Sequence, residues 1–148
     1  MNTNPKELMH RLFQEIDAGR DDFVDEYYSE DYRDHTPSRT RGRLEGREGV
    51  REAFAIFRRA FPDARHRVED VVVEGDKVVV RLSAWGTHTG EIFGIPPTGR
   101  EVSQTGIAIY RLADGKITER WSVQSSELLD ELGVAAGAEH APPSPREA

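Results

Sequence analysis

Residues 80–121, VRLSAWGTHTGEIFGIPPTGREVSQTGIAIYRLADGKITERW, decide the fold. Two β-rich runs flank the loop Gly94-Ile95-Pro96-Pro97-Thr98-Gly99, and a third run follows the turn Ala113-Asp114-Gly115-Lys116. Trp85 and His88 fall near the end of the first run, and Trp121 falls at the end of the third. Aromatic and imidazole side chains at strand ends, beside a rigid loop, are typical of the wall of a small-molecule pocket.

The strand pattern extends towards the N-terminus from this stretch. Residues 68–73 are β-branched and apolar, and the turn Glu74-Gly75-Asp76 joins them to a second run, which predicts a hairpin. The strand predicted over 77–89 would be about 40 Å long at ~3.3 Å per residue, so it must bend, and Gly86 and Gly90 are the expected places. Residues 101–111 and 116–123 supply two more strands.

Helices are expected before the strands. Asn4 and Pro5 predict the start of a helix that ends at Gly19. A short amphipathic segment follows at 23–28, and a third helix is expected over 47–60. Residues 31–37 are predicted to be irregular, because proline at 37 disfavours helix before it. A last helix is expected over 125–132.

Helices followed by antiparallel strands define an α+β protein. The predicted architecture is a cone-shaped α+β barrel, in which N-terminal helices pack on a strongly bent antiparallel sheet and enclose a pocket. Residues 1–133 are expected to form one domain, and the Pro-rich residues 134–148 are expected to be a disordered tail.

Composition excludes several classes of function. The 148 residues include 27 acidic and 20 basic ones, for a net charge of −7 without a basic run, which argues against nucleic-acid binding. The chain has no cysteine, so thiolate chemistry is excluded. Histidine spacing does not favour a metal site. No window is apolar enough to cross a membrane, and we expect a cytoplasmic protein.

Several motifs together resemble the SnoaL-like polyketide cyclase family of the nuclear transport factor 2-like superfamily. They are the segments 32–37, 61–63, 86–90, 94–99, 110–121 and 129–133, which read YRDHTP, FPD, GTHTG, GIPPTG, YRLADGKITERW and LDELG. The resemblance implies a cavity for a small, largely apolar carbonyl compound. It also implies intramolecular aldol ring closure without cofactor or metal, started by a carboxylate that removes a proton between two carbonyls.

The sequence departs from the family where that carboxylate is expected, shortly after Trp121. Ser122 and Ser125 occupy this region, and the first carboxylate that follows is Glu127. His35 and His88 are therefore the predicted catalytic bases, since the ordinary histidine pKa is ~6.5. The alternatives are a non-catalytic module that binds a small molecule, or a hydrolase of the same fold. A protein-interaction role, as in the transport-factor branch, is less favoured by the dense charge.

Both histidines also have a structural interpretation. His88 continues an apolar strand face, so it either holds the Gly-rich loop or contacts a ligand. His35 precedes Thr36-Pro37, with the same two roles open. Alternation places Trp121 on one strand face with Ile117 and Glu119. The predicted ligand-binding residues are Tyr32, Phe57, Gln104, Trp121 and Ser125.

A homodimer is expected from the outward side of the sheet. Trp85 lies on the other strand face from His88, and together with Val79 and Ile107 it forms an apolar patch. The fold of the resembling family often dimerises by packing such sheet faces together.

Overall fold

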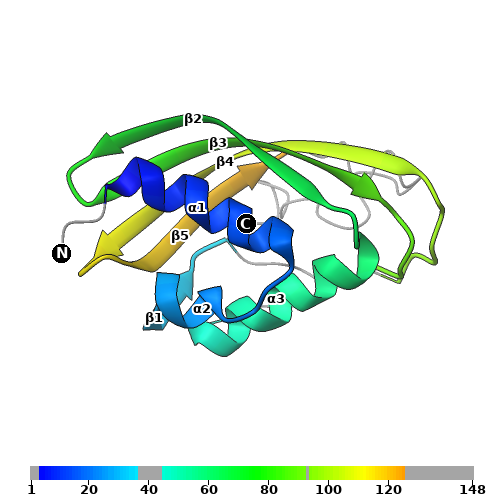
Figure 1. Ribbon diagram of the computed structural model, residues 1–148, viewed down its shortest axis with the longest axis horizontal. Helices are drawn as coiled ribbons and strands as arrows, with labels where there is room; N and C mark the ends of the chain where they lie inside the picture. The colour runs from blue at the N-terminus through cyan, green and yellow to red at the C-terminus, as the bar shows by residue number, and fades with distance from the viewer. Residues whose placement is uncertain (1–3, 37–44, 93, 126–148) are drawn as a thin grey trace, which may run out of the picture.

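The computed structural model describes residues 4–36, 45–92 and 94–125. Helices and strands follow one another in the predicted order, with one additional strand among the helices (Figure 1). The elements are α1 (Pro5–Ala18), α2 (Phe23–Tyr27), β1 (Tyr28–Asp34), α3 (Gly46–Ala60), β2 (Arg65–Glu74), β3 (Lys77–Thr87), β4 (Glu101–Ala113) and β5 (Lys116–Gln124). The α+β class predicted from the sequence is confirmed.

Helix α1 has the ends that the sequence predicts. The Asn4 side chain accepts hydrogen bonds from the backbone N–H groups of Lys6 and Glu7, at 2.9 and 3.4 Å, and so satisfies donors that the first turn leaves free. Gly19 ends the helix with a φ of 77°, a conformation that costs glycine little. The apolar stripe of α1 faces the core with Leu8, Met9, Leu12, Phe13 and Ile16.

The expectation of an irregular segment is wrong for residues 31–34, which belong to the edge strand β1 (Tyr28–Asp34), whereas residues 35 and 36 are irregular and residue 37 lies outside the described ranges. Helix α2 passes directly into β1, which pairs in parallel with β5. The proline at 37 restricts only the residue before it, so it does not oppose an extended strand that ends at Asp34. Parallel pairing with a strand near the other end of the chain is a non-local contact that local sequence patterns do not reveal.

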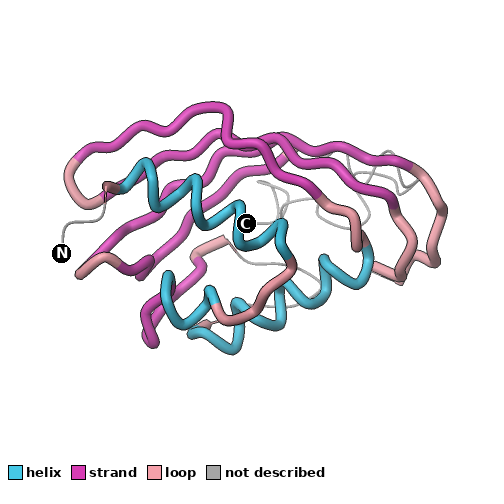
Figure 2. The backbone as a smooth tube through the Cα atoms, viewed as in Figure 1, coloured by secondary structure: helices cyan, strands magenta, loops and turns pink. Residues whose placement is uncertain are grey.

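The sheet has the order β1-β5-β4-β3-β2, and all pairs except β1–β5 are antiparallel. It curves over α1 and α3, as Figure 2 shows in outline. Strand β3 ends at Thr87, two residues before the predicted end. Beyond it, Gly90 approaches the end of α3 so closely that an added Cβ would lie 2.0 Å from the Arg59 carbonyl oxygen. Only glycine fits at this contact between loop and helix.

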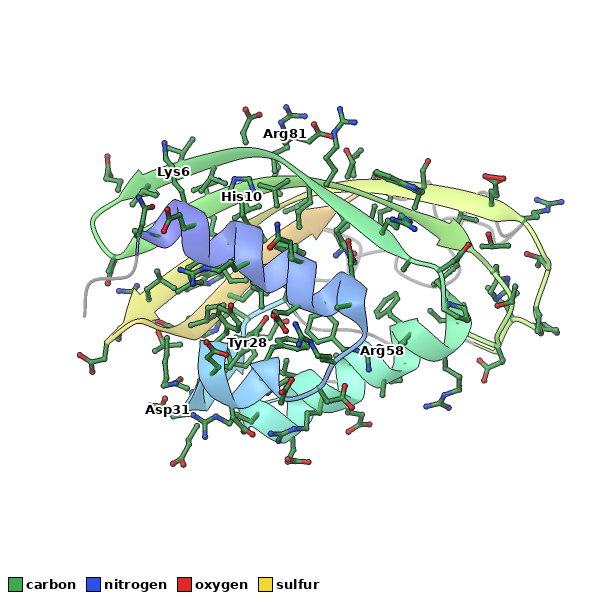
Figure 3. The ribbon with its side chains drawn as sticks, in the orientation of Figure 1. Lys6, His10, Tyr28, Asp31, Arg58 and Arg81 are labelled. Atoms are coloured by element: carbon green, nitrogen blue, oxygen red, sulfur yellow. The ribbon has the colours of Figure 1, made fainter. Side chains whose placement is uncertain are left out.

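The sheet has two unlike faces. We call the face packed against α1, α2 and α3 the helix-covered face; it carries the buried Val78, Val80, Ala108, Tyr110 and Ile117. We call the other the open face; it carries the exposed Val72, Trp85, Ile107 and Val123. Figure 3 shows Tyr28 between the sheet and the helices, whereas Arg81 points away from the opposite side.

A register shift in β5 changes which residues share a face. Ile117 pairs with Leu112, but Trp121 pairs with Ile109, because the pairing slips by one residue between Arg111 and Leu112 of β4. Trp121 therefore lies on the open face, opposite to Ile117. The expectation that alternation keeps them on one face is wrong, since a β-bulge adds one residue to one strand.

The predicted helix over 125–132 and the predicted tail over 134–148 lie outside the described residues, apart from Ser125, which follows β5 without helical structure. The single domain over 1–133 and the cytoplasmic location stay predictions. Within the described ranges, none of the helices has the length and apolar character needed to cross a membrane.

Candidate functional site

An ion pair joins the two neighbouring strands β1 and β5 on the helix-covered face. Asp34 is the register partner of Arg120, and Arg120 Nη1 donates to Asp34 Oδ2 at 2.9 Å. The other oxygen of Asp34 accepts a hydrogen bond from the Thr36 backbone N–H at 3.0 Å. The side chains of Asp34 and Arg120 remain 24% and 22% accessible, so this charged pair is partly exposed to solvent.

Three buried tyrosines surround this pair. Tyr110 is the register partner of Arg120 and lies in the core with Tyr28 and Tyr32, whose rings meet edge to face at 4.9 Å. Burial raises the pKa of Tyr28 and of Tyr32, and for Tyr32 the nearby Asp34 carboxylate adds to the effect. These phenols stay protonated at neutral pH and can donate hydrogen bonds.

Arg120 stays a cation in this setting. Burial opposes its charged form, but the Asp34 carboxylate and a hydrogen bond with Tyr110 favour it, and the pKa of the guanidinium is raised. A fixed cation, a carboxylate and neutral phenols thus meet at one place on the helix-covered face. This is the set of groups that proton transfer with oxyanion stabilisation requires.

Two predicted ligand-binding residues lie further along the sheet. Gln104 of β4 shares the helix-covered face with the buried Val102 and Ala108, and its side-chain amide donates to the Ser125 carbonyl oxygen at 3.3 Å. The Ser125 hydroxyl in turn accepts a hydrogen bond from the Thr105 backbone N–H at 3.2 Å. These contacts place Gln104 and Ser125 together where β4 and β5 run side by side.

His35 and Trp121 also lie together, but on the open face. Their rings stack with centroids 4.8 Å apart at an interplanar angle of 15°. His35 Nε2 lies 2.9 Å from Glu119 Oε1, and Arg111 forms an ion pair with the other oxygen of Glu119. The hydrogen bond with His35 is the main reason that the pKa of Glu119 is lowered, and Arg111 adds to it. We call these four residues the open-face cluster.

His88 is completely buried and holds a loop. Its Nδ1 accepts a hydrogen bond from the Thr98 backbone N–H at 3.2 Å and lies 2.9 Å from the Thr98 hydroxyl. Backbone hydrogen bonds also join His88 to Arg100 and Gly99. These contacts fasten the segment 98–100 to the end of β3, as the structural interpretation of this histidine expects.

The remaining predicted residues lie on the helix-covered side. Tyr32 belongs to the tyrosine cluster next to Asp34. Phe57 of α3 packs with Phe61, Ile92 and Val102, the apolar cluster nearest to His88. The predicted site residues are thus divided, with His35 and Trp121 on one side of the sheet and Tyr32, Phe57, Gln104 and His88 on the other.

Asp34 and Arg120 are the pair that sequence patterns do not single out as a site. Asp34 follows Tyr32 at strand spacing, which is a usable signal once β1 is known to be a strand. The signal for Arg120 is weaker, because the bulge in β5 shifts the alternation that would place it. In the part of the chain that the structure describes, no group of three or more His, Asp or Glu side chains is arranged to hold a metal ion.

Comparison with known proteins places this architecture in a family. The family model for SnoaL-like polyketide cyclases matches residues 7–132. The chain is 30% identical to aklanonic acid methyl ester cyclase DauD of Streptomyces sp. (strain C5) over 115 residues, which cover 76% of this chain and 71% of the relative. It is 32% identical to nogalonic acid methyl ester cyclase of Streptomyces nogalater over 106 residues, or 70% of this chain and 78% of the relative.

Solved structures agree with these matches. The crystal structure of IdmH from Streptomyces antibioticus superposes with a TM-score of 0.76 at 32% identity, over 89% of this chain and 100% of that one. The structure of TsrD from Streptomyces laurentii gives a TM-score of 0.78 at 30% identity, over 88% and 95%. The chain belongs to the SnoaL-like polyketide cyclase family and has the cone fold of the nuclear transport factor 2-like superfamily.

Proposed function

We propose that the protein is a cofactor-independent cyclase that holds a small, largely apolar carbonyl compound on the helix-covered face and closes a ring by an aldol-type reaction. The observation that carries this proposal is the accessible Asp34–Arg120 pair among the buried tyrosines. It supplies a carboxylate base although Ser122 and Ser125 occupy the region where the family's acid is expected.

The proposed reaction begins with a carbon that lies between two carbonyl groups. Asp34 takes a proton from this carbon, and the electron pair stays in the substrate as an enolate. The enolate carbon then attacks a second carbonyl of the same molecule, and the new alkoxide takes the proton back. The tyrosine hydroxyls, which burial keeps protonated at Tyr28 and Tyr32, and the Arg120 guanidinium would stabilise the oxyanions.

The roles of His35 and His88 as bases stay predictions, and the contacts of both residues favour other roles. His35 is on the open face with Glu119 and Trp121, and His88 has its Nδ1 occupied by Thr98. A base must lie within hydrogen-bond reach of the proton that it removes. Asp34 is partly exposed on the helix-covered face, where we propose that the ligand binds.

The relatives indicate the kind of compound to test. DauD is named for aklanonic acid methyl ester, and the Streptomyces nogalater relative for nogalonic acid methyl ester. We propose a substrate of this kind, a polyketide with neighbouring carbonyl groups. The assay incubates the purified protein with aklanonic acid methyl ester and follows ring closure by chromatography, with solvent deuterium uptake at the acidic carbon measured by NMR.

Ring closure or deuterium uptake above the uncatalysed rate is the expected result. Tight binding without either would favour the alternative of a non-catalytic binding module, which the serines after Trp121 also support. Release of an acid from the ester would indicate a hydrolase instead. Absence of both binding and turnover for this and related β-dicarbonyl compounds would contradict the proposal.

We also propose that two copies pair through their open faces. Trp85, Ile107 and Val123 are 43%, 48% and 77% exposed there, which is unusual for large apolar side chains in water. Some charges on this face are paired within one chain, as Arg81 is with Asp70 and Arg111 with Glu119, which lowers the cost of burying them between two copies. Light scattering should give a dimer, and a Trp85→Glu variant should give a monomer; a monomeric wild-type protein would contradict this.

A further inference from the structure

The charges around Arg120 have a consequence for the ligand. Arg120 forms its ion pair with Asp34, and Tyr28 and Tyr32 nearby stay neutral because burial raises their pKa. The pair as a whole therefore has no net charge. A cation surrounded by protein needs a counter-ion, and here the residue that supplies it is also the proposed base.

Protonation of Asp34 would leave Arg120 without its counter-ion. The carboxylate would become a neutral acid, while the guanidinium would keep its charge because its pKa is raised. In a site of reduced dielectric this is costly unless another anion takes the place of the carboxylate. The enolate that forms in the proposed reaction is such an anion, and it forms in the same step.

We propose that Asp34 and Arg120 act as a charge-exchanging pair: Arg120 is the counter-ion of Asp34 while the ligand is neutral, and of the ligand's oxyanion once Asp34 is protonated. This inference rests on the proposed function and concerns the same site. In this inference Arg120 stabilises the anionic intermediate. The charge of Asp34 decides whether the site prefers a neutral or an anionic ligand.

The step is balanced in protons and charge. A C–H bond of the ligand breaks, an O–H bond forms at a carboxylate oxygen of Asp34, and the electron pair remains on the ligand. One negative charge thus moves from Asp34 to the ligand oxygen, and the charge of Arg120 does not change. The site is neutral with the ligand before and after the transfer, so a neutral ligand is favoured at first and a permanent anion is not.

The test uses a nitro-substituted 2-naphthol as the probe, since its neutral and ionised forms differ in absorbance and its oxyanion resembles an enolate. Binding is measured as a function of pH for the wild type, Asp34→Asn, Arg120→Met and the double variant. Asp34→Asn imitates the protonated carboxyl group. The wild type should bind the neutral form, and Asp34→Asn should gain affinity for the anion by about tenfold or more, the range for a charge-assisted hydrogen bond.

The double variant provides the decisive control. Arg120→Met alone leaves Asp34 without a cation and is expected to lower stability, whereas the double variant is neutral and should fold. The double variant should not show the gain in affinity for the anionic probe that Asp34→Asn shows. Arg81→Gln, a change on the open face, should bind as the wild type does.

The outcomes separate this inference from the proposed function. If the probe binds the wild type but Asp34→Asn shows the same preference for neutral over ionised probe, the charge exchange is contradicted and the binding site remains. A gain that survives in the double variant contradicts the role of Arg120. If no form of the probe binds to any variant, the proposed site and this inference both fail.

Discussion

The two faces of the sheet at β1 and β5 carry clusters that look alike in composition and differ in setting. On the open face, His35 and Arg111 share Glu119 beside Trp121. On the helix-covered face, Arg120 pairs with Asp34 beside tyrosines. Adjacent residues thus join opposite clusters, Asp34 and His35 at the end of β1 and Glu119 and Arg120 within β5. The identity of a residue says less about its role than the face to which it points.

The setting decides which cluster can do chemistry. The carboxylate of Glu119 is stabilised by two partners near the solvent, and its pKa is lowered, so it is a weak base. Asp34 also has two partners, but its ion pair with Arg120 is partly exposed beside the buried Tyr28, Tyr32 and Tyr110, and next to buried apolar groups electrostatic interactions are stronger than in water. The comparison therefore favours the helix-covered face for the proposed reaction and a structural role for the open-face cluster.

The largest expected effect separates the two neighbours Asp34 and His35. Asp34→Asn should lower turnover of the β-dicarbonyl substrate by about 10²–10⁴-fold, the usual contribution of a general base. His35→Asn removes the stack on Trp121 and the bond to Glu119, yet it should leave turnover within a few-fold of the wild type. Steady-state rates of the two variants test this directly.

The matched control is His88→Gln, which removes the other predicted base. It should lower the melting temperature, because the side chain is fully buried and holds the Thr98 segment. Turnover by the folded fraction should change little. If His35→Asn or His88→Gln abolished turnover in a folded protein while Asp34→Asn did not, the assignment of the base would be wrong.

A second comparison concerns packing on the two faces. Ile117 is fully buried on the helix-covered face, so Ile117→Ala should lower the free energy of unfolding by about 2–5 kcal/mol. Val123 is 77% exposed on the open face, and Val123→Ala should change the free energy of unfolding of the monomer by less than about 0.5 kcal/mol. Urea unfolding measures both. Equal losses would show that the faces have been assigned wrongly.

The smallest expected effect is the pH dependence of the open-face cluster. Hydrogen bonding with His35 lowers the pKa of Glu119 in the folded protein below its ordinary value of 4.5. The ionised Glu119 side chain therefore stabilises the folded protein fully above its unfolded-state pKa. This stabilisation is lost as the pH falls through the lowered folded-state pKa. Glu119→Gln should be less stable than the wild type at neutral pH, and the difference should shrink in acid. A difference that grows in acid would contradict this.

Local patterns were sufficient for most of the elements. The cap at Asn4 and the alternation in β3 led to the correct helix and strand, because these features depend on neighbours in sequence. The parallel edge strand β1 and the bulge in β5 depend on pairing between distant segments. For this reason alternation alone predicts the wrong face for Trp121 and does not reveal that Asp34 and Arg120 form a pair.

The most direct test of the account uses side-chain NMR signals during titration with the naphthol probe. The chain has two tryptophans, Trp85 and Trp121, and both lie on the open face. The account predicts that the Nε–H signal of Arg120 shifts on binding while both indole N–H signals stay in place. A shift of the Trp121 indole with an unchanged Arg120 signal would contradict it and would place the ligand on the open face.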